Sequence, residues 1–266
     1  MKEYNMLKKL YFLLLVFLIL GCKSPKEEKH LLGSINDSEV LNEVSENYEA
    51  LDSNKLHINF KKRGDYNLLK NHLKNDRVYF KKLLESNSEK AIDSASSYLY
   101  TKLINDIVPH WYGTTWDFNG YTNIPNQGDI ACGYFVSTTL KHLGFNLNRY
   151  KMAQQAGLIE AQVLQPKSKL QMFSNVSFKA LKKKLNGFYS EGIYFIGLDN
   201  HVGYVLIKDK ELYFLHSSYY DDKVMIELAE KSPCFGSQFY VFAEITTNRE
   251  LVKKWILNEA LIIPSS

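Results

Sequence analysis

The chain has 266 residues, of which 45% are hydrophobic and 14% aromatic, so it can form a substantial core and is not a disordered protein. Its formal net charge of +4 falls to +2 once the first 21 residues are set aside. This balance excludes the strongly basic surface by which proteins bind nucleic acid. We therefore expect one main domain with an appendage and no nucleic-acid partner.

The N-terminus has the pattern of an export signal. Lys2, Lys8 and Lys9 precede an uninterrupted apolar run of 11 residues, from Leu10 to Leu20. Because a membrane-spanning helix needs roughly 20 residues, this run is too short to cross a bilayer. The alternative is a signal anchor that ends at a cysteine by chance.

The apolar run ends at Ile19-Leu20-Gly21-Cys22, which resembles a bacterial lipobox. The resemblance implies that residues 1–21 are a lipoprotein signal peptide and that Cys22 is lipidated and becomes the new N-terminus. Two or three acyl chains hold a protein stably on a membrane. We therefore expect an exported protein, anchored by lipid in the bacterial cell envelope.

Two segments separate this signal from the main domain. Residues 22–64 are polar, contain the charged cluster KSPKEEK and are predicted to be a tether. Residues 65–109 are predicted to be a helical region, with apolar positions at helical spacing over 66–84 and 89–108. Pro109 is expected to end the second helix.

The remaining residues, 110–266, are predicted to form an α+β domain. After a loop over 110–127, we expect a helix over 130–143 that Gly144 ends, and short helices over 149–156 and 178–185. The pattern then becomes that of strands over 192–198, 201–207, 212–217 and 239–245, before a closing helix over 248–261. Helices followed by strands favour an antiparallel sheet with a helix packed on it.

Cys132 is a candidate nucleophile because it lies in the first turn of the helix over 130–143. We expect Asp129 to cap this helix, whose unpaired amide groups and dipole favour a thiolate and an oxyanion. A cysteine on an apolar helix stripe is, taken alone, more often a small buried hydrophobic residue. Its interpretation therefore depends on whether a base lies nearby.

Two histidines on a predicted hairpin supply that base. A two-residue turn at Asp209-Lys210 places position 203 opposite His216, and His201 then shares the same face. The two histidines become diagonal neighbours, roughly 7 to 8 Å apart at the backbone. A three-residue loop would instead shift the pairing by one residue and place the two side chains on opposite faces of the sheet. The hypothesis is that Cys132 attacks, His201 takes its proton and His216 orients His201.

Four short motifs, in this order and spacing, are similar to those of NlpC-type cell-wall peptidases: Gly113–Gly120, Ala131–Val136, His201–Leu206 and Leu215–Ser217. These enzymes are papain-like and related to CHAP amidases. The resemblance spans residues 113–245, about half of the chain. It implies a papain-like antiparallel sheet with a packed nucleophile helix, catalytic Cys132, His201 and His216, and peptidoglycan stem peptides as substrate.

The chain also departs from the family pattern. The family has Asp before the cysteine and Ser-Gly after it, whereas Ala131, Gly133 and Tyr134 stand here. These departures concern the substrate more than the triad. The family has an upstream tyrosine that helps to form the oxyanion site; Trp116 stands in its place here, and Tyr112 or Tyr121 is a candidate for the same role. Gln127 is a candidate oxyanion donor by analogy with papain. Asp117 is a candidate contact to substrate amides, with turn formation as its alternative.

Two further residues, Cys234 and Arg149, carry expectations that the structure can address. Cys234 has no base nearby in sequence and is interpreted as structural, with a disulfide to Cys132 as the alternative. Arg149 is expected on a helix surface near the mouth of the site.

No metal or organic cofactor is expected, because the seven histidines show no HExxH or CxxC-like ligand spacing. The sequence thus predicts a monomeric, envelope-anchored cysteine hydrolase that cleaves an amide bond through an acyl-thioester. The alternatives are an acyltransferase or N-acyl amidase acting on another substrate, and a non-catalytic binding lipoprotein on a degenerate peptidase fold.

Overall fold

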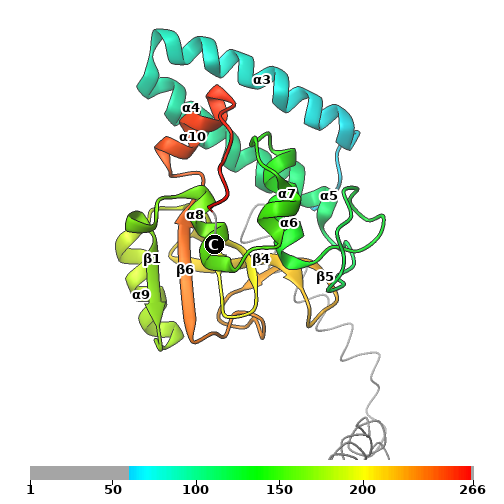
Figure 1. The fold of residues 1–266 in the computed structure, drawn as a ribbon, viewed down its shortest axis with the longest axis vertical. Coiled ribbons are helices and arrows are strands. Elements are labelled where there is room, and N and C mark those ends of the chain that lie inside the picture. Colours follow the sequence, from blue (N-terminus) through cyan, green and yellow to red (C-terminus); the bar gives the residue numbers. More distant parts are fainter. Residues whose placement is uncertain (1–59, 265–266) are drawn as a thin grey trace, which may run out of the picture. The chain divides into compact units, whose positions relative to one another are not determined.

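The computed structural model describes residues 60–264 of the chain (Figure 1). The predicted signal peptide, the lipidation site Cys22 and most of the predicted tether lie outside these described residues. Within residues 60–264, no helix has the length and apolar character needed to span a membrane.

The helical region predicted over 65–109 is present. It consists of α3 (Tyr66–Ser86), α4 (Ser88–Lys102), the π-helical segment η1 (Leu103–Ile107) and α5 (Val108–Trp111). Each long helix has a polar cap, since Asp65 accepts a hydrogen bond from the amide of Leu68, and Asn87 from that of Lys90. The first two helices pack against each other and against the C-terminal helix α10 (Arg249–Leu257).

Pro109 does not end the second helix, contrary to the prediction. It lies in the first turn of α5, where the missing amide proton of proline is tolerated. The π-helical turn Leu103–Ile107 just before it changes the hydrogen-bonding pattern from i−4 to i−5. The chain therefore remains helical as far as Trp111.

The strands form one antiparallel sheet of six, in the order β1-β6-β2-β3-β4-β5. Their bounds are β1 Gln171–Ser174, β2 Gly192–Gly197, β3 Val202–Lys208, β4 Glu211–Ser218, β5 Lys223–Leu228 and β6 Phe239–Glu244. The α+β class and the antiparallel sheet are thus confirmed. The two edge strands, β1 and β5, were not predicted.

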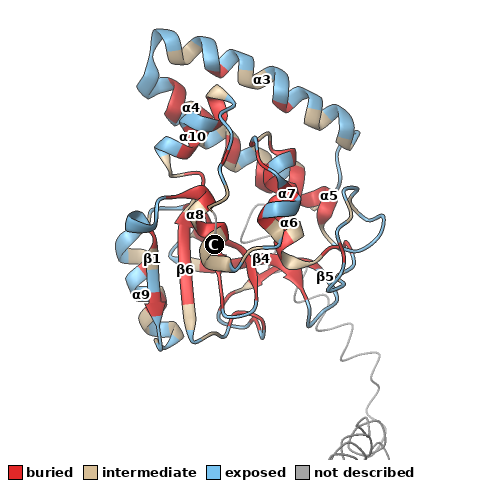
Figure 2. Cartoon of the chain, viewed as in Figure 1, coloured by how far each residue is buried: buried red, intermediate tan, exposed pale blue. Residues whose placement is uncertain are grey.

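Both faces of the sheet are covered, so the central strands are buried along their whole length (Figure 2). Phe195 and Tyr204 face a core shared with helix α6 (Cys132–His142). Their neighbours Tyr194 and Val205 face a second core beneath helix α9 (Phe178–Phe188). Two-sided burial explains why these strands appear as continuous apolar runs in the sequence.

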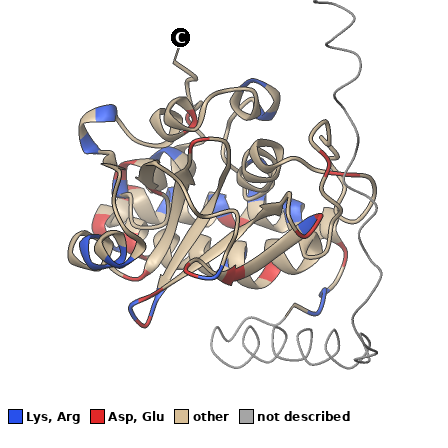
Figure 3. Ribbon diagram, turned by 90° about the horizontal axis from the view of Figure 1, so that it is seen from below, with Lys and Arg blue, Asp and Glu red and all other residues tan. Residues whose placement is uncertain are grey.

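Helix α7 (Arg149–Ala153) packs against both α6 and α8 (Gly157–Leu164). The short 3-10 turn η2 (Lys167–Lys169) follows α8. Helix α6 packs on β3 and β4, and α8, which was not predicted, packs on β2 and β6. Figure 3 shows basic and acidic residues interspersed over the described chain.

Candidate active site

Cys132 is the first residue of α6 and is partly exposed, whereas the other cysteine of the described chain, Cys234, is buried. The predicted cap is wrong: the N-cap is Ala131, whose side chain makes no capping bond. Asp129 instead lies in an extended segment, where its carbonyl accepts from the amide of Thr122. The first amide groups of α6 are therefore left without a side-chain cap beside the thiol.

Two cavities open at this thiol, and His201 lines both of them. The first, of about 410 Å³, extends toward α8 and contains Glu160; we call it the α8 cavity. The second, of about 530 Å³, is lined by Trp116, Phe118, Tyr134 and Tyr219; we call it the aromatic cavity. The structure thus brings the predicted nucleophile and the predicted base to one opening.

The hairpin that carries the histidines has the predicted register. Asp209 and Lys210 both have positive φ angles, of 50° and 60°, as a two-residue type I′ turn requires. Lys208 consequently pairs with Glu211. A glycine is needed at position 203, because a β-carbon there would lie 3.0 Å from the β-carbon of His216 and 2.6 Å from the Phe214 ring.

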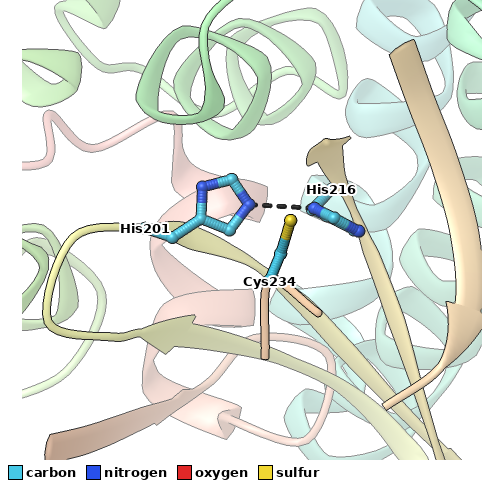
Figure 4. Close-up of side chains that lie close together, drawn as sticks. All are labelled: His201, His216 and Cys234. Carbon is cyan, nitrogen blue, oxygen red and sulfur yellow. Dashed lines mark hydrogen bonds between the residues drawn. The ribbon is translucent and has the colours of Figure 1, made fainter. Parts of the chain in front are cut away.

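The two imidazoles are hydrogen-bonded to each other. Nε2 of His201 lies 2.9 Å from Nδ1 of His216, and the rings are nearly perpendicular (Figure 4). Nε2 of His216 lies 3.1 Å from Oε1 of Glu227, a buried residue of β5. No sequence pattern had indicated Glu227; a lone acid within the apolar segment Val224–Leu228 is the signal that marks it.

This chain of contacts determines which ring nitrogens carry protons. A carboxylate only accepts, so Nε2 of His216 donates to Glu227 and its Nδ1 is left as an acceptor. Nε2 of His201 must then donate to His216. The remaining nitrogen of His201, Nδ1, keeps its lone pair and is the one free to act as a base.

Burial controls the charge of these groups. Burial, together with a smaller effect of the neighbouring His216, lowers the pKa of His201 to about 3. Burial also lowers the pKa of His216, although the hydrogen bond to Glu227 acts in the opposite direction. Burial raises the pKa of the Cys132 thiol. The resting site therefore contains a neutral thiol and neutral imidazoles.

Of the five candidate oxyanion or substrate residues, Trp116 lines the aromatic cavity, 6.2 Å from the ring of Tyr219. The other four, all within the described chain, are not lining residues of either cavity. Tyr112 packs on Phe60, Tyr121 is exposed beside Tyr134, Gln127 is exposed, and the Asp117 side chain accepts from the amide of Asn119 in a turn.

Arg149 is buried rather than on the surface, which corrects the prediction. Its guanidinium donates to the carbonyl of Tyr121 and to the hydroxyl of Thr138 on α6. Five donors in a planar fork suit such a multiple contact. Arg149 thereby holds the loop that contains Tyr121 to the helix that carries Cys132.

Comparison of the chain with protein-family models, with curated proteins and with solved structures finds no significant match. The site must therefore be interpreted from its own geometry.

Cys234 lies beside the histidines, although it is far from both in sequence. Its Sγ, one ring nitrogen of His201 and one ring nitrogen of His216 all lie within 4.8 Å of one another. The thiol is buried and is 3.7 Å from the hydroxyl of Ser218. It is a free thiol, as is Cys132, so the disulfide considered as an alternative is absent from the described chain. Cys234 has no base nearby in sequence, but the fold brings it next to both histidines.

Glu160 is a buried acid in the wall of the α8 cavity. Its Oε2 has no hydrogen-bond partner among the described residues, and burial raises its pKa well above the ordinary range. Gly133 makes room for it, because a β-carbon there would lie 3.3 Å from Oε1 of Glu160 and 2.7 Å from the Ala153 carbonyl. This close packing is a physical reason for glycine after Cys132, where the family pattern has serine.

The site therefore places the Cys132 thiol and the His201 imidazole at one opening, with His201 hydrogen-bonded to His216 and His216 to Glu227. The thiol lies at a helix N-terminus, where amide groups are available for a negatively charged oxygen. His201 has one nitrogen committed to His216 and one uncommitted. This arrangement is suited to acyl transfer through a thioester.

Proposed function

We propose that the protein is a papain-like cysteine hydrolase of the NlpC type, which cleaves an amide bond with Cys132 as nucleophile and His201 as base. The observation that carries the proposal is that Cys132 and His201 line the same two cavities while Nε2 of His201 is held by His216. The packing of α6 on β3 and β4 agrees with this assignment.

The neutral resting state sets the order of proton transfers. Nδ1 of His201 takes the thiol proton as the sulfur attacks the scissile carbonyl, which avoids a charged pair in the free site. The imidazolium formed is stabilised through His216 by the carboxylate of Glu227. It then protonates the leaving amine, and water hydrolyses the acyl-thioester.

The oxyanion is assigned to the backbone amides at the start of α6. Ala131 offers no capping side chain, so no side chain competes with a substrate oxygen for the amides of the first turn. The backbone amides of Val202, Gly133 and Cys132 lower the pKa of the thiol, against the larger effect of burial, and so stabilise the thiolate as it forms. None of the predicted side-chain donors is required for this step.

The proposed substrate is the stem peptide of peptidoglycan. The motif resemblance and the lipobox support this choice, because both suit an exported enzyme anchored in the envelope. The aromatic cavity has the apolar lining and the few polar groups that a peptide substrate needs.

The test is a digest of purified cell-wall sacculi, resolved by mass, with the native protein, Cys132→Ala and Cys234→Ser. We expect the native protein and Cys234→Ser to release muropeptides and Cys132→Ala to release none. Turnover by Cys132→Ala would exclude the mechanism. If added amines appear in the products, the enzyme is an acyltransferase; release of a fatty acid from N-acyl substrates alone would identify an N-acyl amidase.

A further inference from the structure

Three potential metal ligands converge from separate segments of the chain. His201 precedes β3, His216 lies in β4, and Cys234 lies in the loop before β6. Figure 4 shows the sulfur of Cys234 pointing toward the space between the two rings. Imidazole nitrogen and thiolate sulfur are the ligands that Zn²⁺ and similar thiophilic cations prefer.

The spacing of the ligand atoms fits one small cation. Two nitrogens bound to tetrahedral zinc at about 2.0 to 2.1 Å are separated by roughly 3.4 Å. The nitrogens of His201 and His216 are 2.9 Å apart, and the sulfur lies within 4.8 Å of both. Small side-chain movements would therefore bring all three atoms to ligand distance.

Glu227 supplies the outer contact that metal-binding histidines usually have. Its carboxylate accepts from Nε2 of His216, which leaves the Nδ1 lone pair directed toward Cys234 and His201. Carboxylate–histidine–metal arrangements of this kind fix the ring and raise its basicity. The tautomer of His216 is thus already the one that a metal ion requires.

Tyr219 marks the path from solvent to the cluster. It is 38% exposed and lines the aromatic cavity, and its ring packs edge-on against His201 at 5.1 Å between centroids. Its hydroxyl contacts the thiol of Cys234. Tyr219 therefore lies between the aromatic cavity and the three ligands, on the route by which a cation would enter.

We propose that His201, His216 and Cys234 form a site for a thiophilic divalent cation of the Zn²⁺ type, and that its occupation inhibits the hydrolase. The inhibition rests on the proposed function, whereas the binding does not. On binding, Cys234 releases its proton to solvent. The metal takes the place of the proton on Nε2 of His201, and that ring becomes protonated at Nδ1 instead. Because Nδ1 then carries a proton, His201 can no longer accept one from Cys132.

The binding is tested by titrating the full chain with Co²⁺, which reports thiolate coordination by a near-ultraviolet charge-transfer band and four-coordinate geometry by visible bands. We compare the native protein, Cys132→Ala, Cys234→Ser and Cys234→Ala, all of which contain Cys22 and share its background. The charge-transfer band is expected in the native protein and in Cys132→Ala and not in either Cys234 variant. Displacement of Co²⁺ by Zn²⁺ gives the zinc affinity, expected to fall about tenfold or more without the thiolate.

Inhibition is measured separately with the Cys234→Ser variant. Zn²⁺ is expected to inhibit the native hydrolase and a chelator to restore it, while Cys234→Ser keeps its basal turnover and needs about tenfold more Zn²⁺ for the same inhibition. The site is overturned if the native protein binds no Co²⁺, or if the band disappears in Cys132→Ala and persists without Cys234. If Cys132→Ala remains active, the hydrolase mechanism fails, but the cobalt spectra still decide the metal site.

Discussion

Glu227 and His216 form a buried pair on adjacent strands, with 3.1 Å between Oε1 and Nε2. Through this contact a carboxylate at the edge of the sheet determines the tautomer of His216 and, by the next hydrogen bond, that of His201. The tautomer of His201 therefore depends on a residue that does not line either of the two cavities at Cys132.

Replacing this carboxylate should slow the chemical step. For Glu227→Gln we expect kcat to fall about 10- to 100-fold with little change in KM, because the amide holds the His216 tautomer less firmly and stabilises an imidazolium less. Steady-state kinetics measure both constants. Glu211→Gln, a partly exposed acid at the other end of β4, is the matched control and should behave as the native protein does. A change in KM alone would contradict the positioning role.

The activity should vary little between about pH 5 and pH 8. Burial lowers the pKa of His201 to about 3, so the base stays neutral well below the range in which an ordinary histidine becomes protonated. Burial raises the pKa of Cys132, so the thiol stays protonated over the same range. The pH dependence of kcat/KM measures this, and an acid limb with its midpoint near 6.5 would contradict it.

Glu160→Gln should stabilise the protein at neutral and alkaline pH. Burial raises the pKa of Glu160, so above its ordinary pKa the unfolded chain loses a proton that the folded chain retains, and stability falls as pH rises. Removing the group should increase the free energy of unfolding by on the order of 1 kcal/mol at pH 8 and by nothing near pH 4. Denaturant unfolding at both pH values measures this.

The control for Glu160→Gln is Glu250→Gln, which removes an exposed acid from α10. This variant should leave the pH dependence of the free energy of unfolding as it is in the native protein. Equal effects of the two variants would show that net charge, and not burial of Glu160, is responsible.

The native protein should lose stability as pH falls below about 6.5. Burial lowers the pKa of His142 to about 3. The side chain is held between the hydroxyl of Tyr66 and the amide oxygen of Asn123, both at 3.0 Å. Below the ordinary pKa the unfolded chain binds a proton that the folded chain does not.

In the variant His142→Gln, the free energy of unfolding should therefore fall less steeply with falling pH than in the native protein. The difference in slope should be up to about 1.4 kcal/mol per pH unit between pH 6 and 4. Chemical unfolding across this range gives the slope. His72→Gln, at an exposed position on α3, is the control and should retain the native slope.

Local patterns were sufficient for much of the fold. Helical spacing located α3 and α10 close to their observed bounds, and the apolar runs located β2, β3 and β4. The short elements β1, α8 and β5 were missed, because segments of four to eight residues carry little periodic signal.

The sequence alone determined that a helix begins close to Cys132 and that His201 pairs with His216, because a two-residue turn fixes which hairpin residues share a face. Only the tertiary structure decided that Glu227 and Cys234 lie beside this pair and that Glu160 lines a cavity together with His201. Their positions follow from strand pairing and helix packing between distant segments. No spacing along the chain encodes such contacts, and for that reason motif spacing gave no indication of the His201–His216–Cys234 cluster.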